Sequence, residues 1–348
     1  MSRRAVTLLL AGLLVVGLGV MSVLLPVPYV ILQPGPTTDM LASGKEEAPI
    51  TIKGHRVYPT KGELHMVTVA YLGGPGQRLD MFSALRSWMN PEDAVVPREA
   101  IFPPEQSDQQ TEQQIDQQMT DSQDTATAAA LTELEVDYAH IVGVAAVTKG
   151  KPADGRLQPG DVITAVDGTK VTTSSGAAER IRDHRPGSQV EVTVERKGQT
   201  RDVAMTTVES PDEPGTSIVG VTVQQRYEFP FDVSYAVGEI GGPSAGLVFA
   251  LSVIDKLTPG SLTGGKNIAV TGTIDPSGKV GPIGGVQQKV VGAAHDGAKV
   301  FFAPAANCRD AAAAAPEGLR VVKIETLDAA MKALDALRTG KGAVPSCD

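Results

Sequence analysis

The longest apolar run of the chain lies at its N-terminus. No charged residue occurs between Ala5 and Thr38, and residues 5–25 are almost wholly apolar. A run of this length predicts a single helix that can cross a lipid bilayer. Pro26 and Pro28 then end the helix, because proline cannot continue one.

The charges beside this run predict its orientation. Arg3 and Arg4 precede it, and positive charge marks the cytoplasmic side of a membrane span. We therefore expect a cytoplasmic stub over residues 1–4 and an uncleaved signal anchor over residues 5–31, with Tyr29 at the outer interface. The protein is then a single-pass protein of the cell membrane whose bulk is extracytoplasmic. A cleaved signal peptide is the alternative, which the length of the run and the lack of an Ala-x-Ala site after it disfavour.

The extracytoplasmic region over residues 37–137 has a mixed pattern. Residues 50–58 and 63–71 have the composition of two strands joined by a turn. Residues 79–88 have the spacing of a short amphipathic helix. Residues 106–134 are rich in Gln, Asp, Thr and Ala with sparse apolar positions. That composition predicts a long, mostly exposed helix or a flexible arm.

Short apolar strands separated by turn signals occupy residues 142–208. Pro159–Gly160 and Asp167–Gly168 are turn dipeptides on either side of one short buried strand. The segment resembles a bacterial PDZ domain, and the matching features are Val144–Val147, Lys151–Ala153, Leu157–Ile163, Val166–Gly168, Ala177–Arg182 and Val190–Val194. The resemblance predicts a PDZ domain over residues 138–210, followed by a linker over residues 211–217.

The PDZ resemblance also implies a binding site. Such domains accept an extended peptide as an added strand beside a helix. The resemblance places the carboxylate-binding loop just before the first strand, at Ile141, Val142, Gly143 and Val144. A PDZ fold kept only as a spacer or for self-contacts is the alternative.

A serine between small residues opens an apolar stretch further along the chain. Ser244 lies in Gly242-Pro243-Ser244-Ala245-Gly246, directly before residues 247–253. At a helix start, unpaired backbone N–H groups and the positive dipole end suit a developing oxyanion. A serine hydroxyl needs a base beside it. Lys289, 45 residues later, stands among valines and alanines, and burial favours the neutral amine that a base requires.

This segment resembles the proteolytic domain of the Lon proteases, which use a Ser-Lys dyad in this arrangement. The resemblance runs from about Ile218 to Leu337 and rests on Gly242–Gly246, Thr271–Ile274, Val280–Gly285, Lys289 and Gly297–Lys299 in that order. It implies that Ser244 is the nucleophile, that Lys289 is the general base and that Thr271 orients the lysine. It also implies that Gly242, Pro243 and Gly246 shape the turn around the serine. Lon proteases that carry an ATPase often have an acidic residue three positions before the serine, where this chain has Gly241.

We therefore expect an α+β fold with a Lon-like proteolytic domain over residues 218–338 and a tail over residues 339–348. The expected PDZ domain is a small β-barrel or sandwich with helices. The strands within residues 50–71 lack apolar partners of their own and resemble the opening hairpin of a Lon proteolytic domain. That resemblance predicts that the PDZ domain and the long helix are inserted into one protease domain.

Two alternative functions arise from the same residues. Gly242-x-Ser244-x-Gly246 also fits the nucleophile elbow of an α/β-hydrolase esterase, with Asp275 and His295 following in the required order. That elbow needs a strand running directly into the turn, which the glycines and proline interrupt. The non-enzyme alternative is a membrane-anchored PDZ scaffold with a catalytically inactive Lon-like fold. Both dyad residues are present, which favours the enzyme.

Composition narrows the partners and cofactors. The formal net charge of -9 argues against nucleic acid. The histidines are scattered without zinc spacing, so we predict no metal. Gly260–Asn267 resembles a nucleotide-binding loop but has Asn where Mg²⁺ binding needs Ser or Thr, so we expect no ATP and no cofactor. Cys308 and Cys347 are the only cysteines, and outside the cytoplasm such a pair favours a disulfide.

Taken together, these patterns predict a membrane-anchored, ATP-independent serine endopeptidase. Its substrates are proteins or peptides, and its PDZ domain handles a substrate or a regulator. The resemblance to Lon proteases, which form rings, also favours a homo-oligomer.

Overall fold

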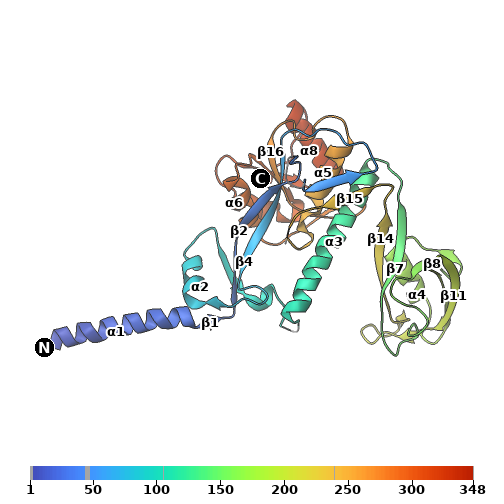
Figure 1. Cartoon of the computed structure of the whole chain (residues 1–348), viewed down its shortest axis with the longest axis horizontal. Helices are drawn as coiled ribbons and strands as arrows, with labels where there is room; N and C mark the ends of the chain where they lie inside the picture. Colours follow the sequence, from blue (N-terminus) through green and yellow to red (C-terminus); the bar gives the residue numbers. More distant parts are fainter. Residues whose placement is uncertain (1–2, 44–47, 105, 239, 348) are drawn as a thin grey trace. The chain divides into compact units, whose positions relative to one another are not determined.

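The computed structural model describes residues 3–43, 48–104, 106–238 and 240–347 (Figure 1). The chain forms two compact units. Unit 1 consists of Met1–Val136 with Phe231–Asp348, and unit 2 consists of Asp137–Pro230. Unit 2 is therefore an insertion in the sequence of unit 1.

The N-terminal apolar run forms helix α1 (Arg3–Leu24), none of whose residues is buried. By length and composition it can cross a membrane, and a signal sequence meets the same criteria. The predicted anchor over residues 5–31 is too long at its C-terminal end. The helix stops before Pro26, and Val30 and Ile31 are instead fully buried in strand β2 (Tyr29–Asp39).

A mixed sheet forms the centre of unit 1. Strand β4 (Glu63–Leu72) pairs in parallel with β16 (Asn267–Val270). Strand β16 in turn pairs in parallel with β19 (Val300–Pro304), and β19 with β20 (Arg320–Ile324). On its other side β4 is antiparallel to β2, which pairs with β6 (Ala94–Pro97). Every residue of β19 is buried, as expected for a parallel strand covered on both faces.

Helices pack around this sheet, with α5 at the centre of the core. Every residue of α5 (Gly246–Leu257) is buried. The other helices of this part are α6 (Val286–His295), α7 (Cys308–Ala314) and α8 (Leu327–Thr339). Shorter elements of unit 1 include β1 (Pro26–Val27), β5 (Leu79–Asp80), α2 (Met81–Trp88), η1 (Arg98–Ala100), β17 (Thr273–Ile274), β18 (Val280–Gly281) and η3 (Ala305–Asn307).

The predicted hairpin within residues 50–71 is wrong. Strand β3 (Ile50–Lys53) pairs with β15 (Asp232–Tyr235) rather than with β4. Both neighbours of β4 are already supplied by β2 and β16. Residues 54–62 therefore form a loop that leads from one sheet to the other.

The Gln-rich segment forms helix α3 (Asp108–Glu133), which belongs to unit 1. A capping box between Ser107 and Gln110 starts it. The expectation of a mostly exposed helix holds for its N-terminal half only, and the helix packs within unit 1 rather than with unit 2. Its C-terminal half contains a buried run from Ala126 to Leu131, because small side chains allow close packing against α5.

Unit 2 is a small β-structure with one helix. Its main sheet has the order β11-β10-β8-β7-β14, around a core that includes Val142, Ile163, Val192 and Met205. The elements are β7 (Ala139–Val147), β8 (Val162–Val166), β9 (Thr169–Lys170), α4 (Ser174–Arg182), β10 (Gln189–Arg196), β11 (Gln199–Thr206), β12 (Val208–Glu209), β13 (Ser217–Ile218) and β14 (Val221–Glu228).

The end of unit 2 lies later in the sequence than the predicted PDZ boundary at residue 210. Strand β13 pairs with β12, and β14 pairs with β7 over its whole length. Residues 217–228, assigned from the sequence to the linker and the protease domain, are therefore part of unit 2.

Candidate active site

Ser244 lies in a 3₁₀ turn, η2 (Pro243–Ala245), directly before α5. Its carbonyl oxygen accepts hydrogen bonds from the backbone N–H of Gly272 at 2.9 Å and from the hydroxyl of Thr271 at 3.2 Å. Gly242 enters the turn with a φ of 91°, in the region that glycine adopts without steric cost. The serine backbone is thus fixed at the N-terminal end of the buried helix.

Lys289 reaches this serine from the second turn of α6. Its Nζ donates a hydrogen bond to Ser244 Oγ at 2.6 Å and another to Thr271 Oγ1 at 3.2 Å. The residue is 3% exposed, and burial lowers the pKa of its amine to about 8. In the part of the chain that the structure describes, no carboxylate forms an ion pair with Lys289. The amine can therefore be neutral near physiological pH.

Thr271 links the Lys289 side chain to the backbone of Ser244. It follows β16 directly and is 1% exposed. Its hydroxyl donates to the Ser244 carbonyl and accepts from Lys289 Nζ, so its hydrogen-bonding direction is fixed. Because a hydroxyl accepts as readily as it donates, Thr271 holds the lysine in place without contributing a charge.

Gly246 permits close packing behind the serine. A Cβ at this position would lie 2.9 Å from Ile274 Cγ2 and 3.2 Å from Ser122 Oγ. These contacts would push β17 or α3 away from the start of α5. Gly246 therefore shapes the turn because it leaves room for these neighbours, and not because it adopts an unusual backbone angle.

Helix α3 holds the serine turn from the outside, which the sequence analysis missed. Ser122 Oγ donates a hydrogen bond to the Pro243 carbonyl at 3.1 Å. The Gly242 N–H donates to the Ile115 carbonyl at 3.3 Å. The available signal was the helical spacing of small or apolar residues at Met119, Ser122 and Ala126, within an otherwise polar segment.

The packing of α3 also accounts for Gly241. A Cβ built there would lie only 1.9 Å from Ile115 Cγ2. An acidic side chain at position 241, as in many ATPase-carrying Lon proteases, has no space beside this helix.

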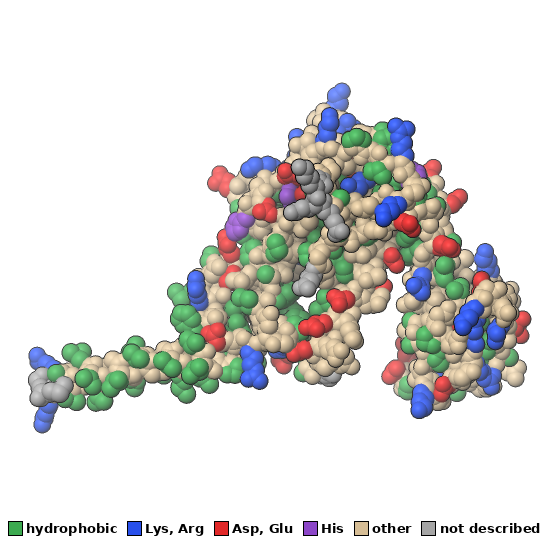
Figure 2. All heavy atoms as spheres, viewed as in Figure 1, with side chains coloured by type: hydrophobic (Ala, Val, Ile, Leu, Met, Phe, Trp, Pro, Cys, Tyr) green, Lys and Arg blue, Asp and Glu red, His purple; other side chains and the backbone are tan. Residues whose placement is uncertain are grey.

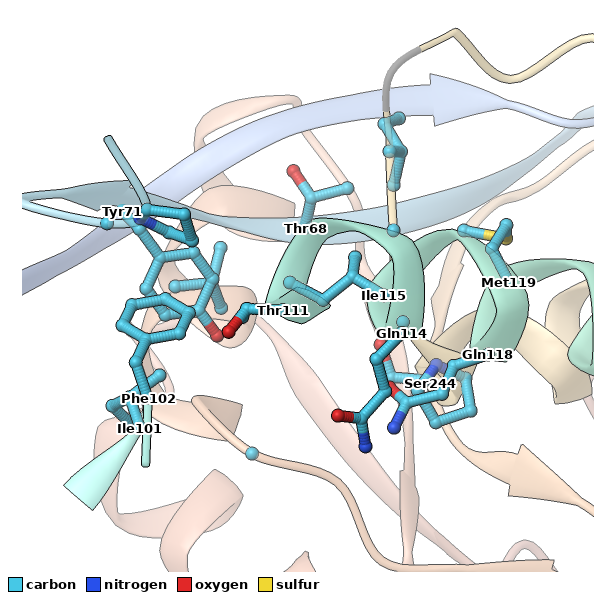
Figure 3. Close-up of a pocket in the computed structure, with 18 of the residues that line it drawn as sticks. Thr68, Tyr71, Ile101, Phe102, Thr111, Gln114, Ile115, Gln118, Met119 and Ser244 are labelled. Carbon is cyan, nitrogen blue, oxygen red and sulfur yellow. The ribbon is translucent and has the colours of Figure 1, made fainter. Parts of the chain in front are cut away.

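A cavity of about 720 Å³ extends from the dyad between α3 and β4. Figure 3 shows Tyr71, Ile101 and Phe102 on the left of the view and Ser244 apart from them below α3, near Gln114 and Gln118, which also line the cavity. Strand β4 pairs with β16 only as far as Met66, although it pairs with β2 as far as Leu72. Among the described strands, none covers the rest of that edge of β4.

The α/β-hydrolase constellation is not assembled. Asp275 accepts hydrogen bonds from Ser277 and from the Lys279 N–H. His295 contacts Glu92 at 3.3 Å. The preceding strand, β15, ends at Tyr235 and does not run into the serine turn. Both predicted triad partners are therefore engaged elsewhere.

The predicted PDZ loop at Ile141–Val144 is wrong. These residues lie within β7, whose edges pair with β8 and with β14. In the described part of unit 2, β14 forms one outer edge of this sheet and β11 the other, and α4 packs against β14. The Gln225 side chain of β14 accepts a hydrogen bond from the Ser174 N–H at the start of α4. The edge strand beside α4 therefore follows the predicted domain in sequence.

The two cysteines form a disulfide in the structure, with Cα atoms 5.1 Å apart. Cys308 begins α7. The tail that carries Cys347 lies along β20, where the Lys323 N–H donates to the Pro345 carbonyl. Among the described residues, no group of His, Cys, Asp and Glu side chains has the arrangement of a metal site.

Comparison with known families identifies two matching segments, and the one that matches a PDZ domain begins within α3 and ends before β14. Residues 235–336 match the model of the Lon protease (S16) C-terminal proteolytic domain, and residues 114–207 match the PDZ domain model. The chain therefore contains a segment of the Lon proteolytic domain type and a segment of the PDZ domain type.

Individual relatives match over short regions. The chain is 40% identical over 90 residues to Lon protease 2 of Herpetosiphon aurantiacus, which is 25% of this chain and 11% of that protein. It is 46% identical over 66 residues to Lon protease of Mesomycoplasma hyopneumoniae, which is 19% of this chain and 7% of that one. The chain thus spans about a tenth of the length of these relatives.

Similar solved structures include a PDZ domain of an SdrC-like protein from Listeria monocytogenes. It is 24% identical, covers 24% of this chain and 85% of that one, and has a TM-score of 0.22. A solution structure from Geobacillus thermodenitrificans is 33% identical, covers 24% of this chain and 94% of that one, and has a TM-score of 0.22.

Proposed function

We propose that this protein is a membrane-anchored serine endopeptidase that cleaves proteins or peptides without ATP, through a dyad of Ser244 and Lys289. The observation that carries the proposal is the 2.6 Å contact between Ser244 Oγ and the Nζ of a buried lysine whose pKa is lowered to about 8. A surface lysine with an ordinary pKa remains protonated and cannot accept a proton. Both residues of the dyad belong to unit 1.

In the proposed reaction, the neutral amine of Lys289 accepts the Ser244 proton while Oγ attacks the carbonyl carbon of the scissile peptide bond. The resulting ammonium then donates that proton to the departing amine, and the C–N bond breaks. Water hydrolyses the acyl-enzyme with Lys289 again acting as the base. Thr271 positions the lysine, and backbone N–H groups of the turn before α5 suit the oxyanion.

The shape of the cavity favours an extended peptide as the substrate. The uncovered edge of β4 beyond Met66 offers backbone hydrogen bonds to an added strand. Beside it, Tyr71 and Phe102 pack edge to face with ring centroids 5.9 Å apart. We propose that bulky apolar side chains of the substrate occupy the space near these rings and Ile101.

Unit 2 supplies a second peptide site in this proposal. The outer edge of β14 beside α4 has the arrangement in which PDZ domains bind an extended chain. Capture of a substrate or regulator there raises its concentration near the dyad, because both sites are on one chain.

Helix α1 is the proposed anchor. Its 22 residues correspond to about 33 Å of helix, which matches a hydrocarbon core of about 30 Å. With Arg3 and Arg4 in the cytoplasm, the rest of the chain lies on the opposite side.

The experiment that tests this function is cleavage of an unfolded protein by the full chain in detergent without nucleotide. We expect cleavage by the wild type and none by Ser244→Ala at equal thermal stability. An inactive wild type, or an equally active Ser244→Ala variant, contradicts the proposal; the former outcome favours the scaffold.

A further inference from the structure

Helix α2 presents an apolar face to the outside of unit 1. Four large apolar side chains along the helix and at its C-terminal end are exposed to solvent: Phe82 at 52%, Leu85 at 47%, Trp88 at 78% and Met89 at 87%. At 100° per residue these side chains fall on one side of the helix. The opposite side, which contains Ser87, packs against the rest of unit 1. This arrangement is the reverse of a helix in a water-soluble protein, whose apolar side faces the core.

The position of this face is fixed relative to the end of α1. The N–H of Met81, the first residue of α2, donates a hydrogen bond to the carbonyl of Leu25 at 3.1 Å. Strand β1 pairs with β5, which joins Pro26 to Asp80 and Val27 to Leu79. Figure 2 shows hydrophobic side chains along α1 and again over α2, directly beside the end of α1. The exposed apolar face therefore continues the apolar surface of the proposed anchor.

The composition of this face fits the boundary between lipid headgroups and acyl chains. Trp88 is the single tryptophan of the chain, and tryptophan concentrates at that boundary, where its ring is apolar and its N–H remains hydrated. Arg78 and Arg86 are exposed beside the face and can reach lipid phosphates. The Asp80 carboxylate is turned away as the N-cap, accepting a hydrogen bond from the Ser83 N–H. Apolar residues flanked by arginines are typical of helices that lie in the membrane interface.

We propose that the face formed by Phe82, Leu85, Trp88 and Met89 docks into the outer leaflet of the bilayer that α1 spans. This proposal rests on the anchoring part of the proposed function. A helix across the bilayer and a second helix in its surface give unit 1 two attachment points. Together they fix the orientation of unit 1 toward the membrane, which a single helix followed by a free linker does not.

The test uses the fluorescence of Trp88 in the full chain reconstituted into vesicles of phosphatidylcholine with about 30% phosphatidylglycerol. Phosphatidylcholine brominated on its acyl chains quenches a tryptophan that contacts lipid, and iodide quenches one that faces water. We expect about twofold quenching by the brominated lipid and protection from iodide, because the ring lies at the headgroup boundary. Phe82→Glu with Leu85→Glu should reverse both effects, since burying two carboxylates in the interface is unfavourable.

A matched control moves the reporter to the exposed surface of α8. Trp88→Phe combined with Lys332→Trp should show quenching by iodide and none by brominated lipid. Extraction with alkaline carbonate separately reports whether α1 is inserted. A chain that resists extraction while its Trp88 stays open to iodide overturns the proposal. Protection from iodide without quenching by brominated lipid also overturns it, because a protein surface then covers the face. Release of the protein by carbonate would show that α1 is not inserted, and the docking of α2 would then be excluded as well.

Discussion

Ile115 of α3 occupies the space that any side chain at position 241 would need. A Cβ on Gly241 would lie 1.9 Å from Ile115 Cγ2, and the next residue, Gly242, donates its N–H to the Ile115 carbonyl. The helix and the turn that carries Ser244 are therefore packed as one assembly. The position of the nucleophile depends on α3 as well as on its own loop.

Gly241→Ala should lower kcat by about tenfold or more, because displacing the turn misaligns Ser244 with its base. Adding Ile115→Ala to that variant should restore much of the activity by making room for the new methyl group. The measurement is kcat on a short peptide for the two single variants and the double variant. If the double variant instead loses as much activity as the two single variants combined, the contact does not position the serine.

The dependence of activity on pH should report Lys289. The base must be neutral, and its pKa is lowered to about 8 by burial. We therefore expect kcat/KM to fall about tenfold for each pH unit below about pH 7 and to level off above the pKa. The assay needs a substrate without titrating groups. A profile that is flat from pH 6 to 9 would remove Lys289 as the base.

The same burial predicts a gain in stability when the amine is removed. The pKa of Lys289 lies below its ordinary value of 10.5 in the folded state, so the unfolded chain binds more protons between about pH 8 and pH 10.5. Stability therefore rises with pH across that window, and the protonated amine opposes folding below it. Lys289→Met should be inactive and more stable at pH 7 by on the order of 1 to 3 kcal/mol. A clear loss of stability in denaturant unfolding would indicate that the lysine has a structural role.

The disulfide should contribute to the stability of unit 1. Cys308 and Cys347 are separated by 39 residues, for which loop entropy gives about 4 kcal/mol at 25 °C. Cys347→Ser should lower the free energy of unfolding by up to that amount while leaving the dyad contact intact. Urea unfolding of wild type and variant measures the difference, and reduced wild type serves as the control. Equal stability of all three samples would contradict the expectation.

Removing unit 2 should separate peptide cleavage from protein cleavage. Replacing Asp137–Pro230 by a short Gly-Ser join leaves unit 1 complete. We expect unchanged kcat/KM on small peptides and slower cleavage of a protein substrate, because capture at the β14 edge is lost. Circular dichroism and thermal unfolding establish first that the variant is folded. Equal losses on both substrates would instead make unit 2 part of the active form of unit 1.

The serine turn and its lysine could be predicted because each is marked by local sequence. Gly242-Pro243-Ser244 sets a helix start, and Lys289 stands among valines and alanines that bury it. The spacing between them matches a known family. The contact itself depends on the serine turn and α6 coming together at Thr271, just after β16, which the sequence alone does not show.

The predictions that were wrong concern segments whose structure depends on distant parts of the chain or on weak local patterns. Strand β14, which lies beside α4 in unit 2, pairs with β7 although more than seventy residues separate them, and pairing across such a distance leaves no local signal in the sequence. Strand β2 was not predicted because its apolar residues directly continue the N-terminal run. Pro34, Gly35 and Pro36 also interrupt the alternation of apolar and polar residues that marks a strand. Helix α3 reads as polar because its buried half relies on alanine and threonine.

The central claim is that Lys289 acts as the base for Ser244, and the most direct test is turnover by Lys289→Arg. A guanidinium stays protonated and cannot accept the serine proton. The matched control is Lys256→Arg, since Lys256 is also buried, at 6% exposed, and its pKa is also lowered by burial. We expect Lys289→Arg to lose at least about a thousandfold in kcat and Lys256→Arg to retain activity, with both variants folded. Turnover by folded Lys289→Arg at the wild-type rate would contradict the account.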